Sequence, residues 1–161
     1  MIKIFTDVAD MIFDKKSFKF GAFTLKLHEE FPDALLSPFF INMRSKDNPT
    51  KKGPLVNADY DLIAQALLFS MNNLSFQAIA GIPRAADPII EAIERAMPEP
   101  RKFRIIKLFK EETKDWRRII PLPGYDLIPS FTVTDLFDRY KNTGRISQEK
   151  YQECIDYVKN N

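Results

Sequence analysis

The stretch from Phe76 to Ile93 combines residue types that together can hold a phosphate group. Its short apolar run, Ala78 to Ile82, predicts a buried strand, and Asp87 followed by Pro88 predicts an N-cap and the first helical position. Anions bind at helix N-termini because the first amides are unpaired and the macrodipole is positive there. Arg84, in the turn between strand and helix, adds a guanidinium group that matches phosphate geometry. The alternative is an ordinary strand-to-helix turn with a solvated arginine.

A second strand is expected after this helix. Residues Phe103 to Leu108 follow Pro98 and Pro100, and the order strand, helix, strand predicts a right-handed βαβ unit with parallel strands. Ligands of parallel sheets bind beyond the carboxyl ends of the strands. Arg84 and the charged segment Lys110 to Arg118, predicted to be a mobile loop, both emerge at that edge. The alternative for the charged segment is a plain solvated surface.

The N-terminal part is predicted to contain helices and two short strands. Alternating apolar and polar residues predict strands at Phe23 to Leu27 and Phe39 to Met43, joined by a loop. A first helix is expected to be capped by Thr6 or Asp7, and a second by Asn57.

The C-terminal part carries helix signals. Thr132 and Asp135 form a capping box, Gly144 ends that helix, and Ser147 caps a last helix. Residues 128–133, just before the first of these helices, favour a short strand.

Composition limits the class of protein. With 161 residues the chain is long enough for one globular domain, and its net charge of +2 is too small for a general nucleic-acid binder. The single cysteine, Cys154, is interpreted as a small core residue, and the single histidine, His28, as a surface residue. The N-terminus does not fit a signal peptide, and no apolar run approaches the roughly 18 residues that span a bilayer. We therefore expect a cytoplasmic protein without a membrane segment.

Four segments, taken in order, resemble the orotate phosphoribosyltransferases. They are KFGAFTLK (Lys19 to Lys26), SPFFINMR (Ser37 to Arg44), AGIPRAADPI (Ala80 to Ile89) and RIIK (Arg104 to Lys107) with the cationic loop after it. The tail from Ser130 to Val158 also resembles the helical end of those enzymes. The resemblance implies an α/β fold, with a parallel-sheet type I phosphoribosyltransferase-like core and a small N-terminal hood. It implies a single domain, with the hood and N-terminal helix at 1–56 and the α/β core with the C-terminal helices at 57–161.

The resemblance also implies an activity and its substrate contacts. Members of the family transfer phosphoribosyl from 5-phosphoribosyl diphosphate to orotate in pyrimidine biosynthesis, with Mg2+ that is delivered here with the diphosphate. Lys26 matches the hood lysine that meets the diphosphate, and Arg84 matches a basic contact to pyrophosphate. Phe39 and Phe40 match the aromatic pair over which the pyrimidine lies. Read without the family, Lys26 is a solvated strand lysine, and adjacent strand aromatics point to opposite faces, so at least one of them belongs to the core.

Three lysines match the family's catalytic cations. Lys107 stands at the strand end, and Lys110 and Lys114 stand in the loop whose cations, in the family, reach a neighbouring subunit's active site. The resemblance therefore implies a homodimer with small-molecule substrates.

One family motif has no counterpart in this sequence. The ribose-phosphate loop of the family follows an apolar strand with two adjacent acids and a turn containing threonine and glycine, and neither Glu29-Glu30 nor Glu111-Glu112 fits that pattern. The family's central strand, its helix and the next strand have no counterpart between Pro123 and Tyr125: either this protein has lost the segment, or the sequence omits it. Several kcal/mol of transition-state stabilisation would be lost with the loop. Two hypotheses stand: an orotate phosphoribosyltransferase, or a non-catalytic nucleotide-binding or subunit-interaction relative.

Overall fold

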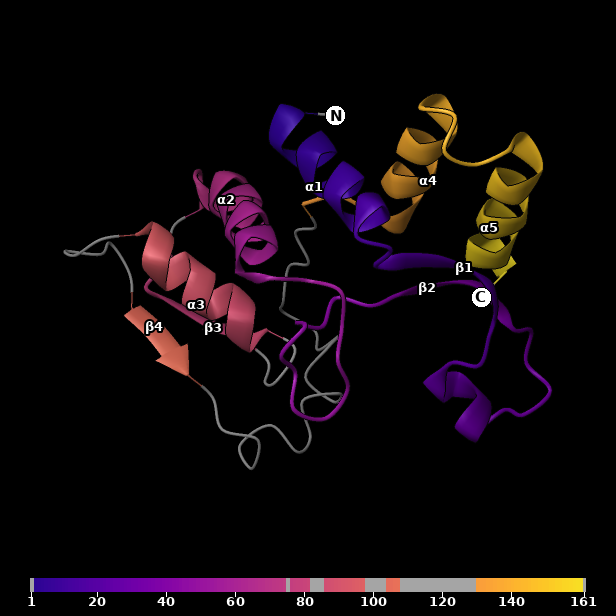
Figure 1. Ribbon diagram of the computed structural model, residues 1–161, viewed down its shortest axis with the longest axis horizontal. Coiled ribbons are helices and arrows are strands. Elements are labelled where there is room, and N and C mark those ends of the chain that lie inside the picture. Colours follow the sequence, from indigo (N-terminus) through magenta and orange to yellow (C-terminus); the bar gives the residue numbers. More distant parts are fainter. Residues whose placement is uncertain (1, 75, 82–85, 98–103, 108–129, 161) are drawn as a thin grey trace.

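The computed structural model describes two small sheets and the helices that cover them (Figure 1). The description covers residues 2–74, 76–81, 86–97, 104–107 and 130–160. The elements, in chain order, are α1 (Lys3–Asp14), β1 (Phe18–Phe23), the 3-10 turn η1 (Lys26–Glu29), β2 (Ser37–Ile41), α2 (Asn57–Met71), β3 (Ala78–Gly81), α3 (Asp87–Ala96), β4 (Arg104–Lys107), α4 (Val133–Asn142) and α5 (Gln148–Asn160).

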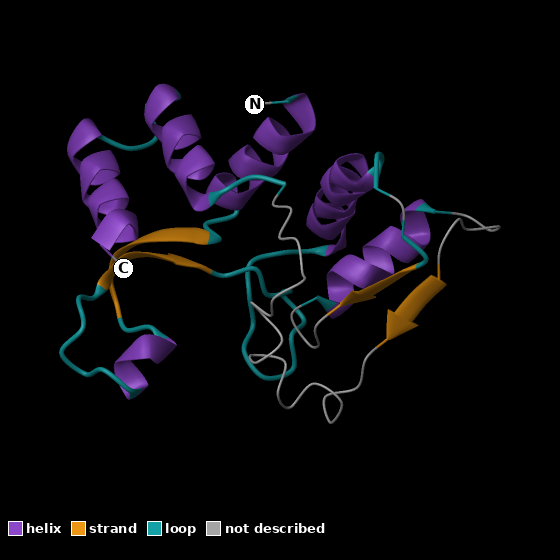
Figure 2. Cartoon of the chain, turned by 180° about the vertical axis from the view of Figure 1, so that it is seen from behind, coloured by secondary structure: helices purple, strands orange, loops and turns teal. Residues whose placement is uncertain are grey.

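The strands β1 and β2 form an antiparallel hairpin whose inner face is buried by helices. In its register Phe18 lies opposite Ile41 and Phe20 opposite Phe39, so these four side chains share one face. Figures 1 and 2 show α1, α4 and α5 together on one side of the hairpin. The ring of Phe18 meets those of Phe137 and Tyr140 on α4 edge-on, with centroids 5.8 and 5.4 Å away.

The C-terminal helices thus pack on the N-terminal hairpin, far from their neighbours in sequence. The buried residues form one cluster that includes members of α1, α2, α3, α4 and α5. The division into a hood at 1–56 and a core at 57–161 stays a prediction.

The predicted βαβ order is confirmed in β3, α3 and β4. The two strands pair in parallel, from Ala78 opposite Arg104 to Gly81 opposite Lys107. Gly81 lets α3 approach, because a Cβ there would lie 2.6 Å from Cγ1 of Ile90. Within the described ranges no other strands pair in parallel, so the wider parallel core stays a prediction.

Several predicted boundaries move. The first strand spans Phe18–Phe23, and Lys26 begins the 3-10 turn η1 instead of lying in a strand. Helix α1 begins at Lys3, before Thr6 and Asp7. Asp87 and Pro88 are the first two residues of α3, whose N-cap is Ala86.

The N-terminus of α2 differs from the prediction for a physical reason. Its N-cap is Val56 instead of Asn57, because the N–H of Val56 donates to Oδ2 of Asp59 at 2.8 Å. The helix then packs against α1 and α3.

The helix caps predicted in the C-terminal part are confirmed. Oγ1 of Thr132 accepts from the N–H of Asp135 at 3.2 Å, and the N–H of Thr132 donates to Oδ2 of Asp135 at 2.6 Å, which is a capping box. Gly144 has φ +69°, the left-handed conformation expected after a helix end, and Oγ of Ser147 accepts from the N–H of Lys150 at 3.1 Å. The predicted strand at 128–133 is not formed at 130–133, because Val133 already begins α4.

The predicted burial is confirmed for the single cysteine and is wrong for the single histidine. Cys154 is fully buried, and burial raises the pKa of its thiol to about 11, so the interpretation as a core residue is confirmed. His28 is half-buried instead of being a plain surface residue: the N–H of Leu25 lies 2.9 Å from its Nδ1. No helix in the described part of the chain is long and apolar enough to cross a membrane.

Tyr140 gives a test of the contact between α4 and α1. Its hydroxyl donates to the carbonyl oxygen of Ala9 at 2.9 Å in a fully buried position, and burial raises the pKa of this phenol. We expect Tyr140→Phe to lower the free energy of unfolding by about 1 kcal/mol, because a buried carbonyl loses a donor. Urea unfolding measures this difference. In the control Tyr151→Phe, the lost bond is to an exposed carboxylate of Asp138, and we expect less than about 0.5 kcal/mol. An equal loss in the two variants would contradict this prediction.

Candidate functional site

The carboxyl ends of β3 and β4 meet at one edge, where a polyanion site was predicted. The two strands end level with each other, because Gly81 is paired with Lys107. The carboxyl ends of the two described strands therefore lie side by side, at the edge where ligands of parallel sheets bind. Arg84, Lys110 and Lys114 lie outside the described residues, so their assignment to this edge stays a prediction.

Lys26 is placed elsewhere. It is the first residue of η1, which is the purple turn at the lower right of Figure 1, whereas β3 and β4 lie at the left. Figure 2 shows the same separation from behind. Within one chain, the backbone of Lys26 and the end of β4 are thus not brought together. The proposed contact of Lys26 with the diphosphate stays a prediction.

The aromatic pair is separated by the hairpin. Phe39 faces the core, where its ring stacks with Phe18 at 5.6 Å and meets Phe137 edge-on at 5.1 Å. Phe40 points to the other face, where its ring centroid lies 5.7 Å from that of Phe23. The expectation that at least one of the two belongs to the core is confirmed by Phe39. A contact of Phe40 with a pyrimidine stays a prediction.

Phe23 was missed by sequence reasoning as a neighbour of Phe40. The register of the hairpin shifts between Phe20 and Phe23, so a two-residue repeat in the sequence does not by itself assign Phe23 to the face of Phe40.

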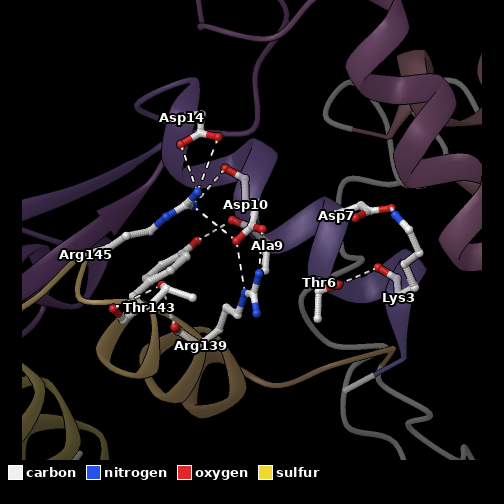
Figure 3. A network of polar contacts seen from close by, with 10 residues as sticks. Lys3, Thr6, Asp7, Ala9, Asp10, Asp14, Arg139, Thr143 and Arg145 are labelled. Atoms are coloured by element: carbon white, nitrogen blue, oxygen red, sulfur yellow. Dashed lines mark hydrogen bonds and ion pairs between the residues drawn. The ribbon is translucent and has the colours of Figure 1, made fainter.

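The densest group of polar contacts in the described part of the chain joins α1 to α4 and to the turn after α4 (Figure 3). Asp10 accepts from Nη2 and Nε of Arg139 at 2.7 and 3.1 Å, and its Oδ1 lies 3.2 Å from Nη1 of Arg145. Nη2 of Arg145 lies 3.2 Å from Asp14. Since the acids and the cations pair with each other, this group is structural, and no substrate contact is assigned to it.

A cavity of about 570 Å³ lies beside the same helices. Its charged lining residues are committed to internal bonds: Asp135 to Thr132, Asp138 to Tyr151 and Arg139 to Asp10. Its other lining residues are Ile2, Phe5, Thr6, Ser130, Phe131 and Asn142. We therefore assign no reaction to this cavity.

Comparisons with known proteins identify a fold. The sequence matches no family model and no curated protein. The structure is similar to that of UMP synthase from Leishmania donovani, with a TM-score of 0.67 and 19% sequence identity over 96% of this chain. The chain spans 42% of the length of that protein. This likeness supports a phosphoribosyltransferase-like fold.

The two phenylalanines of β2 can be distinguished by stability. Phe39→Ala removes a ring from the aromatic core, so we expect the free energy of unfolding to fall by roughly 2–4 kcal/mol. Phe40→Ala removes one aromatic neighbour on the outer side, and we expect a loss of about 1 kcal/mol. Chemical denaturation measures both free energies of unfolding. The two values can be compared if the free energy falls with denaturant concentration at the same slope in both variants. The assignment of faces would be wrong if Phe40→Ala were the more damaging change.

The ion pairs of Asp10 predict a pH dependence of stability. The hydrogen bond from Arg139 is the main cause that lowers the pKa of Asp10. A carboxyl with a lowered folded pKa contributes stability above its unfolded pKa of about 3.9 and loses it as the pH falls through the folded value. We expect Asp10→Asn to cost about 1–2 kcal/mol at pH 7 and progressively less below about pH 4.

Unfolding of the wild type and Asp10→Asn from pH 7 to pH 3 measures the difference. Asp7→Asn is the control, because the ion pair of Asp7 seen in the described ranges is with the highly exposed Lys3, and we expect a cost below about 0.5 kcal/mol. A gap between Asp10→Asn and the wild type that is constant over this range would contradict the prediction.

Proposed function

We propose that this protein is orotate phosphoribosyltransferase-like and transfers phosphoribosyl from 5-phosphoribosyl diphosphate to orotate, with release of pyrophosphate. The observation that carries the proposal is the likeness to a solved UMP synthase over 96% of this chain. Two further observations support it: parallel strands that end level at Gly81 and Lys107, and an outward-facing Phe40 in the hairpin.

The chemistry proposed for these residues is electrostatic. The leaving pyrophosphate gains negative charge as its bond to the ribose breaks, and fixed cations around it lower the barrier. We assign Lys107, Lys110 and Lys114 to this catalytic role, with Arg84 and Lys26 as further contacts to the diphosphate. Phe40 is assigned to the flat pyrimidine, because an aromatic face stacks on a planar ring.

Magnesium enters the proposal as part of the diphosphate substrate. The described residues bring together no group of three acidic, histidine or cysteine side chains, so we assign no protein ligand to the ion. Diphosphates carry Mg2+ through their own oxygens, and the ion neutralises charge that the cations must otherwise meet alone.

A homodimer is part of the proposal. The turn η1, which begins at Lys26, lies apart from β3 and β4 within one chain in both ribbon views. In a homodimer, lysines of one copy can complete the diphosphate site of the other copy. The family resemblance implies this arrangement for Lys110 and Lys114.

The second candidate is a non-catalytic relative that binds nucleotides or a subunit. The observation in its favour is the lack of a ribose-phosphate loop motif, since Glu29 ends the 3-10 turn η1 and Glu30 follows it in an exposed turn. In the family, the adjacent acids that contact the ribose follow a strand directly. Glu29 and Glu30 instead lie at the end of a 3-10 turn, so they do not match that motif.

An absorbance assay decides between the two. With the purified full chain, we expect orotate absorbance to fall when 5-phosphoribosyl diphosphate is added, and only with Mg2+ present. We expect Lys107→Gln to slow this reaction at least about 10-fold, because one fixed cation opposite the leaving group is lost. Lys159→Gln, an exposed lysine at the end of α5, is the control and should leave the rate unchanged.

A flat trace with pure wild-type protein would reject the transferase. Calorimetric binding of orotate or diphosphate without turnover would then identify the non-catalytic relative.

A further inference from the structure

The outer face of the hairpin is built differently from its inner face. We define the outer face by four residues: Lys19, Gly21 and Phe23 on β1, and Phe40 on β2. Phe40 is the direct partner of Lys19 in the antiparallel register, and this register shifts between Phe20 and Phe23. Beyond the shift, Phe23 is assigned to the outer face by the contact of its ring with Phe40 and by its closeness to the Cβ position of Gly21.

The two aromatic rings of the outer face touch each other. The centroids of Phe23 and Phe40 lie 5.7 Å apart with a 34° tilt between the rings, and both side chains are half-buried. Neither ring belongs to the cluster of apolar side chains that forms the core. An aromatic surface of this kind can accept a planar ligand ring.

Gly21 determines how Phe23 lies on this face. A Cβ at position 21 would come within 3.3 Å of Cε2 and Cζ of Phe23, so the ring of Phe23 lies across the place where a side chain would stand. Gly21 is exposed, and its lack of a side chain keeps the strand backbone accessible between Lys19 and Phe23.

Lys19 supplies a cation at the edge of this surface. It is exposed, and it forms no ion pair with any residue of the described ranges. Directly opposite residues of an antiparallel pair have Cβ atoms about 4.5–5.5 Å apart, so the long side chain of Lys19 can reach the rim of a ring stacked on Phe40.

We propose that the outer face binds a planar heterocycle that carries a carboxylate, with the ring on Phe40 and Phe23 and the carboxylate paired with Lys19. The inference rests on the proposed function, in which the base is orotate, and it adds a specificity residue. Lys19 distinguishes the acidic pyrimidine from a neutral one, whereas the two rings bind both. The pair between Lys19 and the carboxylate is partly exposed, so its contribution corresponds to about a 5- to 10-fold change in affinity.

Calorimetry with orotate and with its neutral methyl ester tests the proposal on the full chain. We expect the wild type to prefer orotate to the ester by about 5- to 10-fold, Lys19→Gln to lose that preference, and Lys19→Arg to keep it. We expect Phe40→Leu to weaken both ligands to a similar extent. Lys159→Gln is the matched control for the loss of one exposed positive charge, and circular dichroism checks that each variant is folded.

The outcomes separate this inference from the proposed function. Equal orotate affinity of the wild type and Lys19→Gln, in a protein that converts orotate, would overturn the role of Lys19 and leave the transferase standing. Loss of the preference in Lys19→Gln without any turnover would support the site and reject the transferase. Absence of orotate binding and of turnover in the wild type would overturn both.

Discussion

The packing of Phe18 against Phe137 and Tyr140 is the contact on which the rest of the described structure depends. It joins the first strand of the hairpin to helix α4, which lies more than a hundred residues later in the chain. The hydroxyl of Tyr140 continues the same contact to α1. A two-stranded hairpin has little stability alone, and it becomes stable only when one face is covered by other elements. The N-terminal hairpin and the C-terminal helices therefore form one unit despite their separation in sequence.

Burial of the inner face has a consequence for the outer face. Side chains of a strand alternate, so a slip of β1 by one residue against β2 would turn Lys19 toward the core in place of Phe18 or Phe20. The free-energy cost of burying an unpaired ammonium group makes that register very unfavourable. The aromatic core thus holds Lys19, Phe23 and Phe40 on the outer face by means of contacts that none of these three makes itself. A substitution of Phe18 or Phe137 would accordingly disturb the outer face indirectly, through the register of the hairpin.

Sequence reasoning succeeded where the signal is local. The capping box at Thr132, the left-handed Gly144 and the cap at Ser147 depend on residues within one helical turn, and the βαβ order depends on turn residues and short apolar runs. It failed at the strand expected from Phe23 to Leu27, because alternation over five residues does not determine where a strand ends. The choice between Phe39 and Phe40 needed the register, which depends on helices far along the chain.

The ion pairs of Asp10 illustrate a further limit. Its partners Arg139 and Arg145 are separated from it by more than a hundred residues, and acids and arginines of this kind look like ordinary solvated charges in a sequence. Their partial burial between α1 and α4 is visible only in the structure. The same holds for the distance between Lys26 and the end of β4, since the short matching motifs give the order of the residues along the chain and not their separation in space.

The hairpin and the βαβ unit divide the proposed function between two places. The outer face of the hairpin offers aromatic surface and one cation, which suits recognition of a planar acid. The carboxyl ends of β3 and β4 lie side by side, and the proposed function assigns the polyanion to this edge. Transfer requires that the base and the ribose meet with their reacting atoms in contact, whereas binding of each ligand does not. A chain that retains both surfaces but lacks the ribose-phosphate loop can therefore keep base recognition even where the rate of transfer is low. In the proposed function, recognition of orotate and its conversion are for this reason two separate properties, each assigned to its own set of residues.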